Sequence, residues 1–374
     1  MTFAQTLTLY VGRRFLLSSI TMLTTLTLLV SLFDFIELLR RAATRPDASF
    51  ALVASIAGLR MPFLSIQIMP FAILLGGILA FWRLTRSSEL IVARATGVSA
   101  WGFLLGPIVV ALTFGGLAMT AISPVSSAML SRAERLEATF LRAGGGVTAL
   151  AGGRLWLRQA DRELEPGGVA IISGRPTVLL SSRRNLDFSI EDVTIWRLSA
   201  NDRALQRIAV PRAQLLPGRW VLENAVLFGA DRLPMPPTTL ILATDLTPDR
   251  IEDSFASPDT LSFWALPGFI AILEQAGFSA IRHRLQFQSL LALPALSVAM
   301  ALLAAGFSMR PSRQGGVARM LGAGVAAGFA LFVLDKVTAE FGESGALPVW
   351  LAAWAPCIAG LLLALGLLLH QEDG

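Results

Sequence analysis

Six hydrophobic stretches constrain this chain more than any other feature of its sequence. A helix needs about 20 apolar residues to cross the roughly 30 Å hydrocarbon core of a bilayer. The stretches that reach this length are Phe15–Leu39, Leu52–Trp82, Trp101–Ile122, Leu285–Met309, Gly316–Val337 and Leu347–Leu369. Hydrophobic residues make up 54% of the chain and charged residues 15%, whereas a soluble domain has about 45–50% and about 25%. The sequence therefore predicts a membrane protein with six transmembrane helices.

The charges are concentrated between the third and fourth stretches. Residues 131–262 contain equal numbers of arginines and acidic residues, so this segment is neutral and the net charge of +5 belongs to the hydrophobic parts. A basic surplus beside a membrane indicates anionic headgroups or orientation signals before it indicates nucleic acid. We therefore expect a soluble domain inserted between two membrane blocks, and no nucleic-acid partner.

The short loops predict the orientation, because cytoplasmic loops carry an excess of basic residues. If the N-terminus is cytoplasmic, the inner segments contain Arg13, Arg14, Arg83, Arg86, Arg94, Arg310, Arg313 and Arg319. The outer loops then contain Arg40, Arg41 and Arg45. This pattern predicts a multi-pass inner-membrane protein with both termini cytoplasmic and the inserted domain in the periplasm of a Gram-negative cell.

The inserted segment has the pattern of a β domain. Short runs of alternating character are separated by turn signals, which is typical of strands. The runs are Arg154–Arg158, Val169–Ser173, Thr177–Leu180, Ser189–Leu198, Leu205–Val210, Trp220–Phe228 and Thr238–Ala243. Seven or more short strands without intervening helices favour a sandwich or a jelly roll. The order of the strands is left open by the sequence.

These patterns predict three parts of the chain. Residues 1–130 form three transmembrane helices with a short cytoplasmic helix at about 86–98, and residues 131–262 form a jellyroll-like periplasmic domain. Residues 263–374 form an interfacial helix and three further transmembrane helices. The predicted fold class is an α-helical membrane protein with six transmembrane helices and an inserted all-β domain.

Residues for cofactor or metal chemistry are scarce. Cys357 is the only cysteine, and His283 and His370 are the only histidines, with no HExxH pattern between them. The single lysine, Lys336, does not follow a glycine-rich loop, so the chain lacks the ATP-binding loop that uses such a lysine. We therefore expect a non-catalytic protein without a cofactor or a metal site.

The loop between the second and third stretches contains a candidate coupling helix. Ser87 or Ser88 can cap it, Glu89 falls in its first turn, where the helix dipole favours an anion, and Gly97 can end it. Leu90 contributes to an apolar side. Such a helix either lies on lipid or docks into a groove of a soluble partner, and its composition does not decide between the two.

Arginines also gather at the predicted outer end of the helices, where the orientation rule does not expect them. One interpretation is a solvated rim, partly neutralised by Asp34, Glu37, Glu134 and Glu137. The other is a basic collar for a phosphate-bearing lipid, because guanidinium groups match phosphate oxygens in pairs. The candidate headgroup-binding residues are Arg40, Arg41, Arg60, Arg132 and Arg135.

Four sequence segments carry a resemblance to a known family. They are RSSELIVARATGVS at Arg86–Ser99, VLDKVTAEFG at Val333–Gly342, LYVGRRFL at Leu9–Leu16 and FDFIELLRRA at Phe33–Ala42. With the three-span, β-domain, three-span order, the chain resembles the lipopolysaccharide-export permease family LptF/LptG over nearly its whole length. Its N-terminal segments are more similar to the LptG branch than to the LptF branch.

The resemblance implies a function that the residue spacing does not. Such subunits belong to an ABC transporter that extracts lipopolysaccharide from the outer leaflet of the inner membrane and passes it to a periplasmic bridge. The implied partners are an LptF-like permease, two copies of the ATPase LptB, and LptC and LptA of the bridge. The implied ATPase-coupling residues are Glu89, Leu90, Arg94 and Gly97.

The same resemblance bears on the collar. Arg40 and Arg41 match the basic pair of the family's first periplasmic loop, and Arg132 and Arg135 match basic positions after the third span. Phe63 falls where some relatives have a lysine, and the nearby Arg60 is the candidate substitute. The alternative function is a mechanotransmitting subunit that couples a cytoplasmic ATPase to a periplasmic partner without moving lipid.

Overall fold

Two compact units make up the chain. The computed structural model describes residues 3–43, 49–87, 100–140, 148–151, 154–161, 168–179, 187–199, 203–228, 234–244, 246, 257–275, 279–308 and 317–372. The helical unit comprises Met1–Leu141, Pro258–Pro267 and Ile281–Gly374. The β unit comprises Arg142–Ser257 and Gly268–Ala280. The predicted limits of the inserted domain, residues 131 and 262, both fall within the helical unit, and the predicted boundaries remain predictions.

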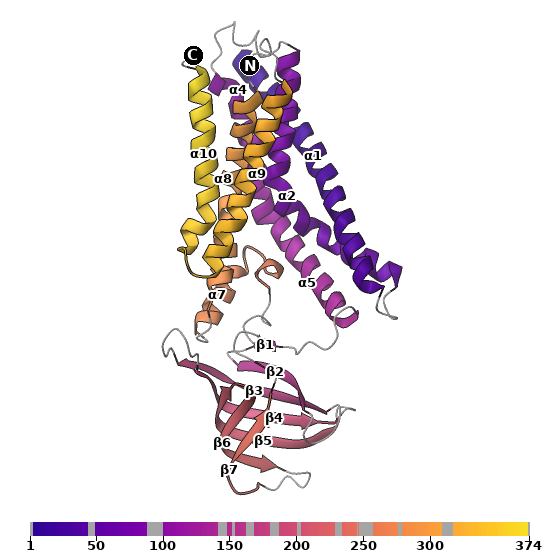
Figure 1. Ribbon diagram of the computed structural model, residues 1–374, viewed down its shortest axis with the longest axis vertical. Coiled ribbons are helices and arrows are strands. Elements are labelled where there is room, and N and C mark those ends of the chain that lie inside the picture. Colours follow the sequence, from indigo (N-terminus) through magenta and orange to yellow (C-terminus); the bar gives the residue numbers. More distant parts are fainter. Residues whose placement is uncertain are drawn as a thin grey trace. The chain divides into compact units, whose positions relative to one another are not determined.

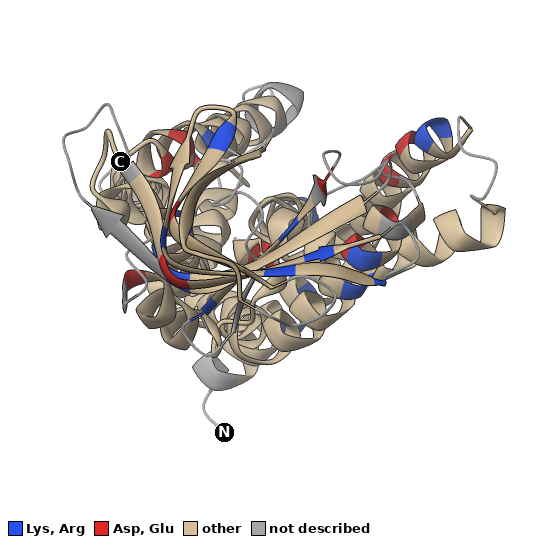
Figure 2. Cartoon of the chain, turned by 90° about the horizontal axis from the view of Figure 1, so that it is seen from below, with Lys and Arg blue, Asp and Glu red and all other residues tan. Residues whose placement is uncertain are grey.

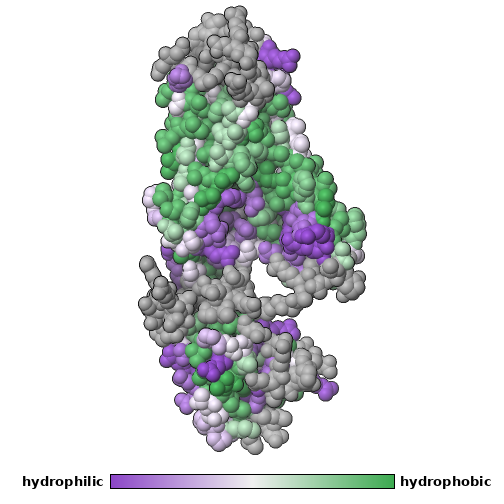
Figure 3. All heavy atoms as spheres, viewed as in Figure 1, coloured by the Kyte–Doolittle hydropathy of each residue, from purple (hydrophilic) through white to green (hydrophobic). Residues whose placement is uncertain are grey.

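Within the described residues, the helical unit contains six helices long and apolar enough to cross a membrane, as predicted. Their segments are α1 (Phe3–Ala42), α2 (Phe50–Arg86), α4 (Ala100–Leu117) with α5 (Ser123–Phe140), α8 (Ile281–Ser308), α9 (Val317–Glu343) and α10 (Val349–Glu372). The start of α1 and the end of α10 lie at the same end of the bundle (Figure 1). A broad hydrophobic surface covers the middle of this unit, with hydrophilic residues towards its ends (Figure 3). Both features suit a bundle that crosses a membrane an even number of times.

Small residues let the helices of this unit approach closely. A Cβ added at Gly76 of α2 would lie 2.6 Å from the Cα of Ser19 on α1, and one at Gly106 of α4 would lie 2.3 Å from the Thr8 carbonyl oxygen. Small residues at helix interfaces permit such backbone contact in membranes, where apolar burial gives little drive for association. Most of the buried core residues of this unit come from α1, α2, α4 and α8.

The third span contains one irregular turn. A π-helical turn, η1 (Ala118–Ile122), joins α4 to α5. The segment that leads back into the helical unit docks at this turn, because the Trp264 indole N–H donates to the Thr120 carbonyl oxygen at 3.1 Å. The Phe263 amide N–H donates to the Ser123 hydroxyl at 3.0 Å. Here η2 (Pro258–Thr260) and the residues after it pack against the bundle.

The described residues of the β unit form one seven-stranded antiparallel sheet with its strands in chain order. The strands are β1 (Thr148–Ala151), β2 (Arg154–Asp161), β3 (Gly168–Leu179), β4 (Asp187–Leu198), β5 (Ala204–Leu216), β6 (Arg219–Phe228) and β7 (Thr238–Ala243). The predicted inserted β domain is thus confirmed. The sequence did not reveal β1, and it divided β3 into two runs at Pro176. The sequential order is the feature that the sequence left open.

The inner face of the sheet carries the core of this unit. Leu155, Ile172, Ile195 and Trp220 are almost fully buried there. Helix α7 (Leu266–Gln275) packs against the same core through Leu273. The core of the sheet thus covers Leu273 of α7, which lies in the segment that the sequence predicted as an interfacial helix.

The sheet is curled rather than flat. Asp192 of β4 has a positive φ angle of 49° at the register shift between β3 and β4, and Asn224 of β6 one of 53° at the shift between β6 and β7; such bulges bend strands. Gln159 of β2 reaches across to β7, where its amide donates to the Ala243 carbonyl oxygen at 3.1 Å. Its own oxygen accepts the Thr244 hydroxyl at 2.7 Å. The second and last strands are therefore joined at one end of the sheet.

Candidate functional site

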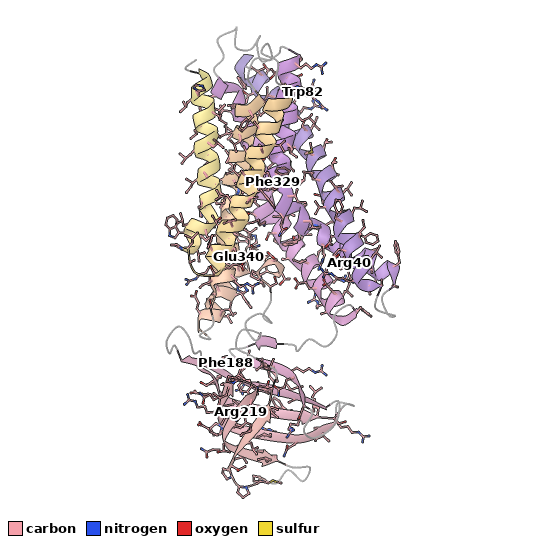
Figure 4. All side chains as sticks on the ribbon, in the orientation of Figure 1. Arg40, Trp82, Phe188, Arg219, Phe329 and Glu340 are labelled. Atoms are coloured by element: carbon pink, nitrogen blue, oxygen red, sulfur yellow. The ribbon has the colours of Figure 1, made fainter. Side chains whose placement is uncertain are left out.

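Charged side chains from three helices meet at the end of the bundle where α1 ends and α2 begins. Figure 4 labels Arg40 at this end and Trp82 at the opposite end. Figure 2 shows basic and acidic residues side by side at one end of otherwise mostly uncharged helices. The arginine–carboxylate cluster consists of Asp34, Glu37, Arg40 and Arg41 of α1, Arg60 of α2 and Glu137 of α5.

The last turns of α1 hold the exposed part of this cluster. Glu37 accepts two hydrogen bonds from Arg40, each at 2.8 Å, and a third from the Nε of Arg41 at 3.0 Å. The spacings of three and four residues place these side chains on one helix face. The Arg40 side chain is 77% exposed and that of Arg41 53%. Both guanidinium groups therefore face the surroundings while one carboxylate holds them in place.

The buried part of the cluster is built around Arg60. Its Nη1 donates to Asp34 Oδ1 at 2.9 Å, and its Nη2 donates to Glu137 Oε2. Glu137 is only 2% exposed and also lies 3.6 Å from the Nη1 of Arg41. A buried charge is tolerated when it is paired and hydrogen-bonded. Arg60 therefore fastens α2 to α1 and α5, and its charge is largely committed to these two carboxylates.

Arg132 and Arg135 are both exposed on α5. Their spacing of three residues places them on one face of that helix, and the helical period turns this face away from Glu137. The structure thus brings together Arg40, Arg41 and Arg60 of the predicted collar, whereas Arg132 and Arg135 present a separate basic face. Whether any of the five binds a headgroup remains a prediction.

The predicted coupling residues cannot be placed in the same way. Glu89, Leu90, Arg94 and Gly97 lie outside the residues that the structure describes. What the structure does show is the end of α2, where the Ser87 amide N–H donates to the Arg83 carbonyl oxygen at 3.0 Å. The second span therefore ends at a capped turn just before the predicted coupling helix.

A second cluster of charged residues was not predicted from the sequence. Asp259 of η2 lies near Lys336 and Glu343 of α9 and Arg282 of α8. Burial raises the pKa of the Asp259 carboxyl, Lys336 lowers it, Glu343 raises it, and Arg282 lowers it. These groups are far apart in the sequence, so only a turn-forming Pro-Asp pair at Pro258 could have drawn attention to them. Within the described part of the chain, histidine, cysteine and acidic side chains form no cluster of three that could hold a metal ion.

Comparisons with known proteins cover nearly all of the chain. Residues 9–370 match the family described as lipopolysaccharide export system permease LptF/LptG. The permease protein LptG of Escherichia coli K12 is 25% identical over 370 residues, which span 94% of this chain and 95% of the relative. LptG of Haemophilus influenzae is 21% identical over 384 residues, which span 98% and 99%. The match extends across both membrane blocks and the inserted sheet, and the chain therefore belongs to the lipopolysaccharide export system permease family LptF/LptG.

Proposed function

We propose that this chain is an LptG-type permease subunit that extracts lipopolysaccharide from the outer leaflet of the inner membrane. It passes the lipid to a periplasmic protein bridge for assembly of the outer membrane. The observation that carries this proposal is the family match over residues 9–370, which includes all six spans and the sheet. The chain is then a non-catalytic subunit, and ATP hydrolysis takes place on a partner.

The orientation follows from the loop charges. Arg13, Arg14, Arg83 and Arg86 lie towards the ends of α1 and α2 that are remote from the arginine–carboxylate cluster. If this end is cytoplasmic, both termini are cytoplasmic, and the cluster and the sheet are periplasmic. The cluster then lies at the level of the outer leaflet, where the phosphates of lipopolysaccharide are found.

The exposed and the buried arginines of the cluster have different roles in this proposal. Arg40 and Arg41 are exposed, so their guanidinium groups can pair with phosphate oxygens. Arg60 is buried between two carboxylates and holds the helices that present them. In this proposal Arg132 and Arg135 add a second exposed basic face, and Arg60 contributes by position instead of by direct headgroup contact.

The proposed partners follow the family. Two copies of the ATPase LptB bind in the cytoplasm through the helix that contains Glu89, Leu90, Arg94 and Gly97. An LptF-like chain completes the permease, and LptC and LptA continue the periplasmic route. The exposed hydrophobic side chains of α1 and α9, such as Leu32 and Phe329, are compatible with contacts to lipid or to a second permease chain.

The test compares two double variants in the assembled transporter. Arg40→Ala/Arg41→Ala and Arg132→Ala/Arg135→Ala are each expected to weaken lipopolysaccharide capture, and the capture should fall as salt rises because exposed charges are screened. Co-purification of the ATPase should be unchanged, whereas Glu89→Arg should reduce it. If the variant with all four arginines replaced extracts lipopolysaccharide at the wild-type rate, these arginines form only a solvated rim and do not bind the headgroup.

A further inference from the structure

A cavity lies between α1 and α2 at the end of the bundle opposite the arginine–carboxylate cluster. Its volume is about 320 Å³, and its walls are formed by Arg14 and Ser18 of α1 and by Ala80, Arg83, Leu84 and Ser87 of α2. This volume lies at the lower end of the range for small-molecule sites. It accommodates a polar headgroup but not a whole lipid.

The packing of the two helices explains why the cavity exists. Below it, Gly76 allows the α2 backbone to touch Ser19 of α1, so the helices are in direct contact. One turn further along α2 stands Ala80, whose side chain is too small to fill the space that opens as the helices separate. The floor of the cavity is therefore made of small residues and its rim of two long arginines.

Both charged residues in the described lining of this cavity are arginines. The α2 sequence contains no acidic residue, and the first acidic residue of α1 is Asp34, far along the helix. Among the described residues, the Arg14 guanidinium donates to the Tyr10 hydroxyl at 2.9 Å, and no carboxylate pairs with it or with Arg83. Carbonyl oxygens in the last turn of α2 accept hydrogen bonds from the hydroxyl and the amide N–H of Ser87. The two guanidinium groups are thus available to an anion.

Loop charge alone does not account for this arrangement. Arg13 and Arg86 satisfy the same orientation rule, yet neither lines the cavity. Arg14 and Arg83 differ because they line one cavity from two helices. Basic pockets between transmembrane helices on the cytoplasmic side bind the headgroups of anionic lipids.

Apolar surface next to the cavity favours a lipid over a free anion. Leu17 lies one helical turn from Arg14 on the same face of α1 and is 53% exposed. Leu9 and Ile20 of α1 are also exposed. An amphiphile could therefore place its phosphate between the arginines and its chains along α1.

We propose that this cavity holds the phosphodiester headgroup of an anionic phospholipid, with Arg14 and Arg83 as its two ligands. The bound lipid would fill the gap between the first two helices next to the start of the predicted coupling helix. The assignment to the cytoplasmic leaflet rests on the proposed orientation. The site itself does not depend on lipopolysaccharide transport, so the two proposals can fail separately.

The experiment measures lipid retained by the intact transporter complex in nanodiscs that contain phosphatidylglycerol and phosphatidylethanolamine. Native mass spectrometry compares the wild type with Arg14→Gln/Arg83→Gln and with the matched control Arg13→Gln/Arg86→Gln. The control removes the same charge from the same helices without touching the cavity. We expect the cavity variant to retain at least about tenfold less phosphatidylglycerol, and the control to resemble the wild type.

Several results would overturn the proposal. Equal retention in all three proteins, or equal loss in both variants, would leave only a diffuse attraction between the basic end and the membrane. Displacement of the bound phosphatidylglycerol by excess inorganic phosphate would assign the cavity to a free anion. If the cavity variant fails to assemble, Ala80→Leu provides the second test, since it fills the space with both arginines in place. Full lipid retention by Ala80→Leu would also contradict the proposal.

Discussion

Burial distinguishes the arginines of the cluster at the scale of single residues. Arg60 is 19% exposed and binds Asp34 and the 2%-exposed Glu137, whereas the Arg40 side chain is 77% exposed. An exposed ion pair contributes little because water screens it and two flexible side chains must be ordered. Removing one partner from a buried pair leaves an uncompensated charge, which is far more costly.

Arg60→Ala is therefore expected to destabilise the protein by roughly 3 kcal/mol, and Arg40→Ala to change its stability little. Thermal unfolding of the detergent-solubilised protein, followed by tryptophan fluorescence, measures both. Adding Glu137→Gln to Arg60→Ala should recover part of the loss, because the buried carboxylate is then replaced by a neutral amide. Unfolding of Arg60→Ala at the wild-type temperature would show that the pairs do not hold α1, α2 and α5 together.

Two aspartates should respond to pH with opposite signs. Burial raises the pKa of Asp259 in the folded protein, so the folded state holds this proton more tightly than the unfolded state does. Its contribution to stability is present below the unfolded value of about 3.9 and is lost as pH rises through the folded pKa. The hydrogen bond from Arg154 lowers the pKa of Asp192, whose contribution is lost as pH falls through its folded pKa.

Asp259→Asn should consequently flatten the loss of stability above pH 4 and make the protein more stable than the wild type near neutral pH. Asp192→Asn should instead reduce the loss of stability on acidification, with a small effect because this pair is exposed. Unfolding midpoints across a series of buffers measure both changes. Parallel pH profiles for Asp259→Asn and the wild type would contradict the assignment.

At the scale of elements, α1 and α2 depend on backbone contact. A Cβ at Gly76 would meet the Ser19 backbone at 2.6 Å, which no side-chain rotation can relieve. Overpacking of this kind typically costs about 1–3 kcal/mol. The same helix offers Gly58, where an added Cβ has no neighbour within 4 Å.

Gly76→Ala is expected to lower the unfolding temperature and to alter the separation of α1 and α2. Gly58→Ala should be neutral or slightly stabilising, because alanine favours a helix by up to about 1 kcal/mol over glycine. The two variants are compared by thermal unfolding in the same detergent. Similar behaviour of both would mean that the helix contact at Gly76 adjusts without strain.

At the scale of the whole molecule, the main prediction to test is the orientation in the membrane, with both termini cytoplasmic and the β unit periplasmic. The only native cysteine, Cys357, is buried, so introduced cysteines can report accessibility after its replacement by alanine. Pro217→Cys lies in the exposed turn between β5 and β6, and Arg13→Cys lies at an exposed position in the first part of α1, far along this helix from the arginine–carboxylate cluster. A membrane-impermeant maleimide should label the first in cells with a permeabilised outer membrane. Labelling of the second before the inner membrane is disrupted would reverse the proposed topology.

Much of the architecture followed from local sequence pattern. The six spans were predictable because a bilayer imposes a minimum length of apolar helix, which is visible in any window of the sequence. The positions of β2 and of β4 to β7 were predictable from alternation, and the pairing of Glu37 with Arg40 and Arg41 from spacings of three and four residues. These features depend on neighbours in the chain.

Tertiary structure alone decided which distant residues meet. The Arg60–Glu137 pair, the surroundings of Asp259 and the cavity between Arg14 and Arg83 join residues from different helices. Their meeting depends on helix crossing and on the placement of small residues such as Gly76 and Ala80. The strand order likewise depends on pairing across the whole sheet. The sequence by itself determined a six-span protein with an inserted β domain, because length and period are local, whereas the partners of its charges depend on how the helices pack.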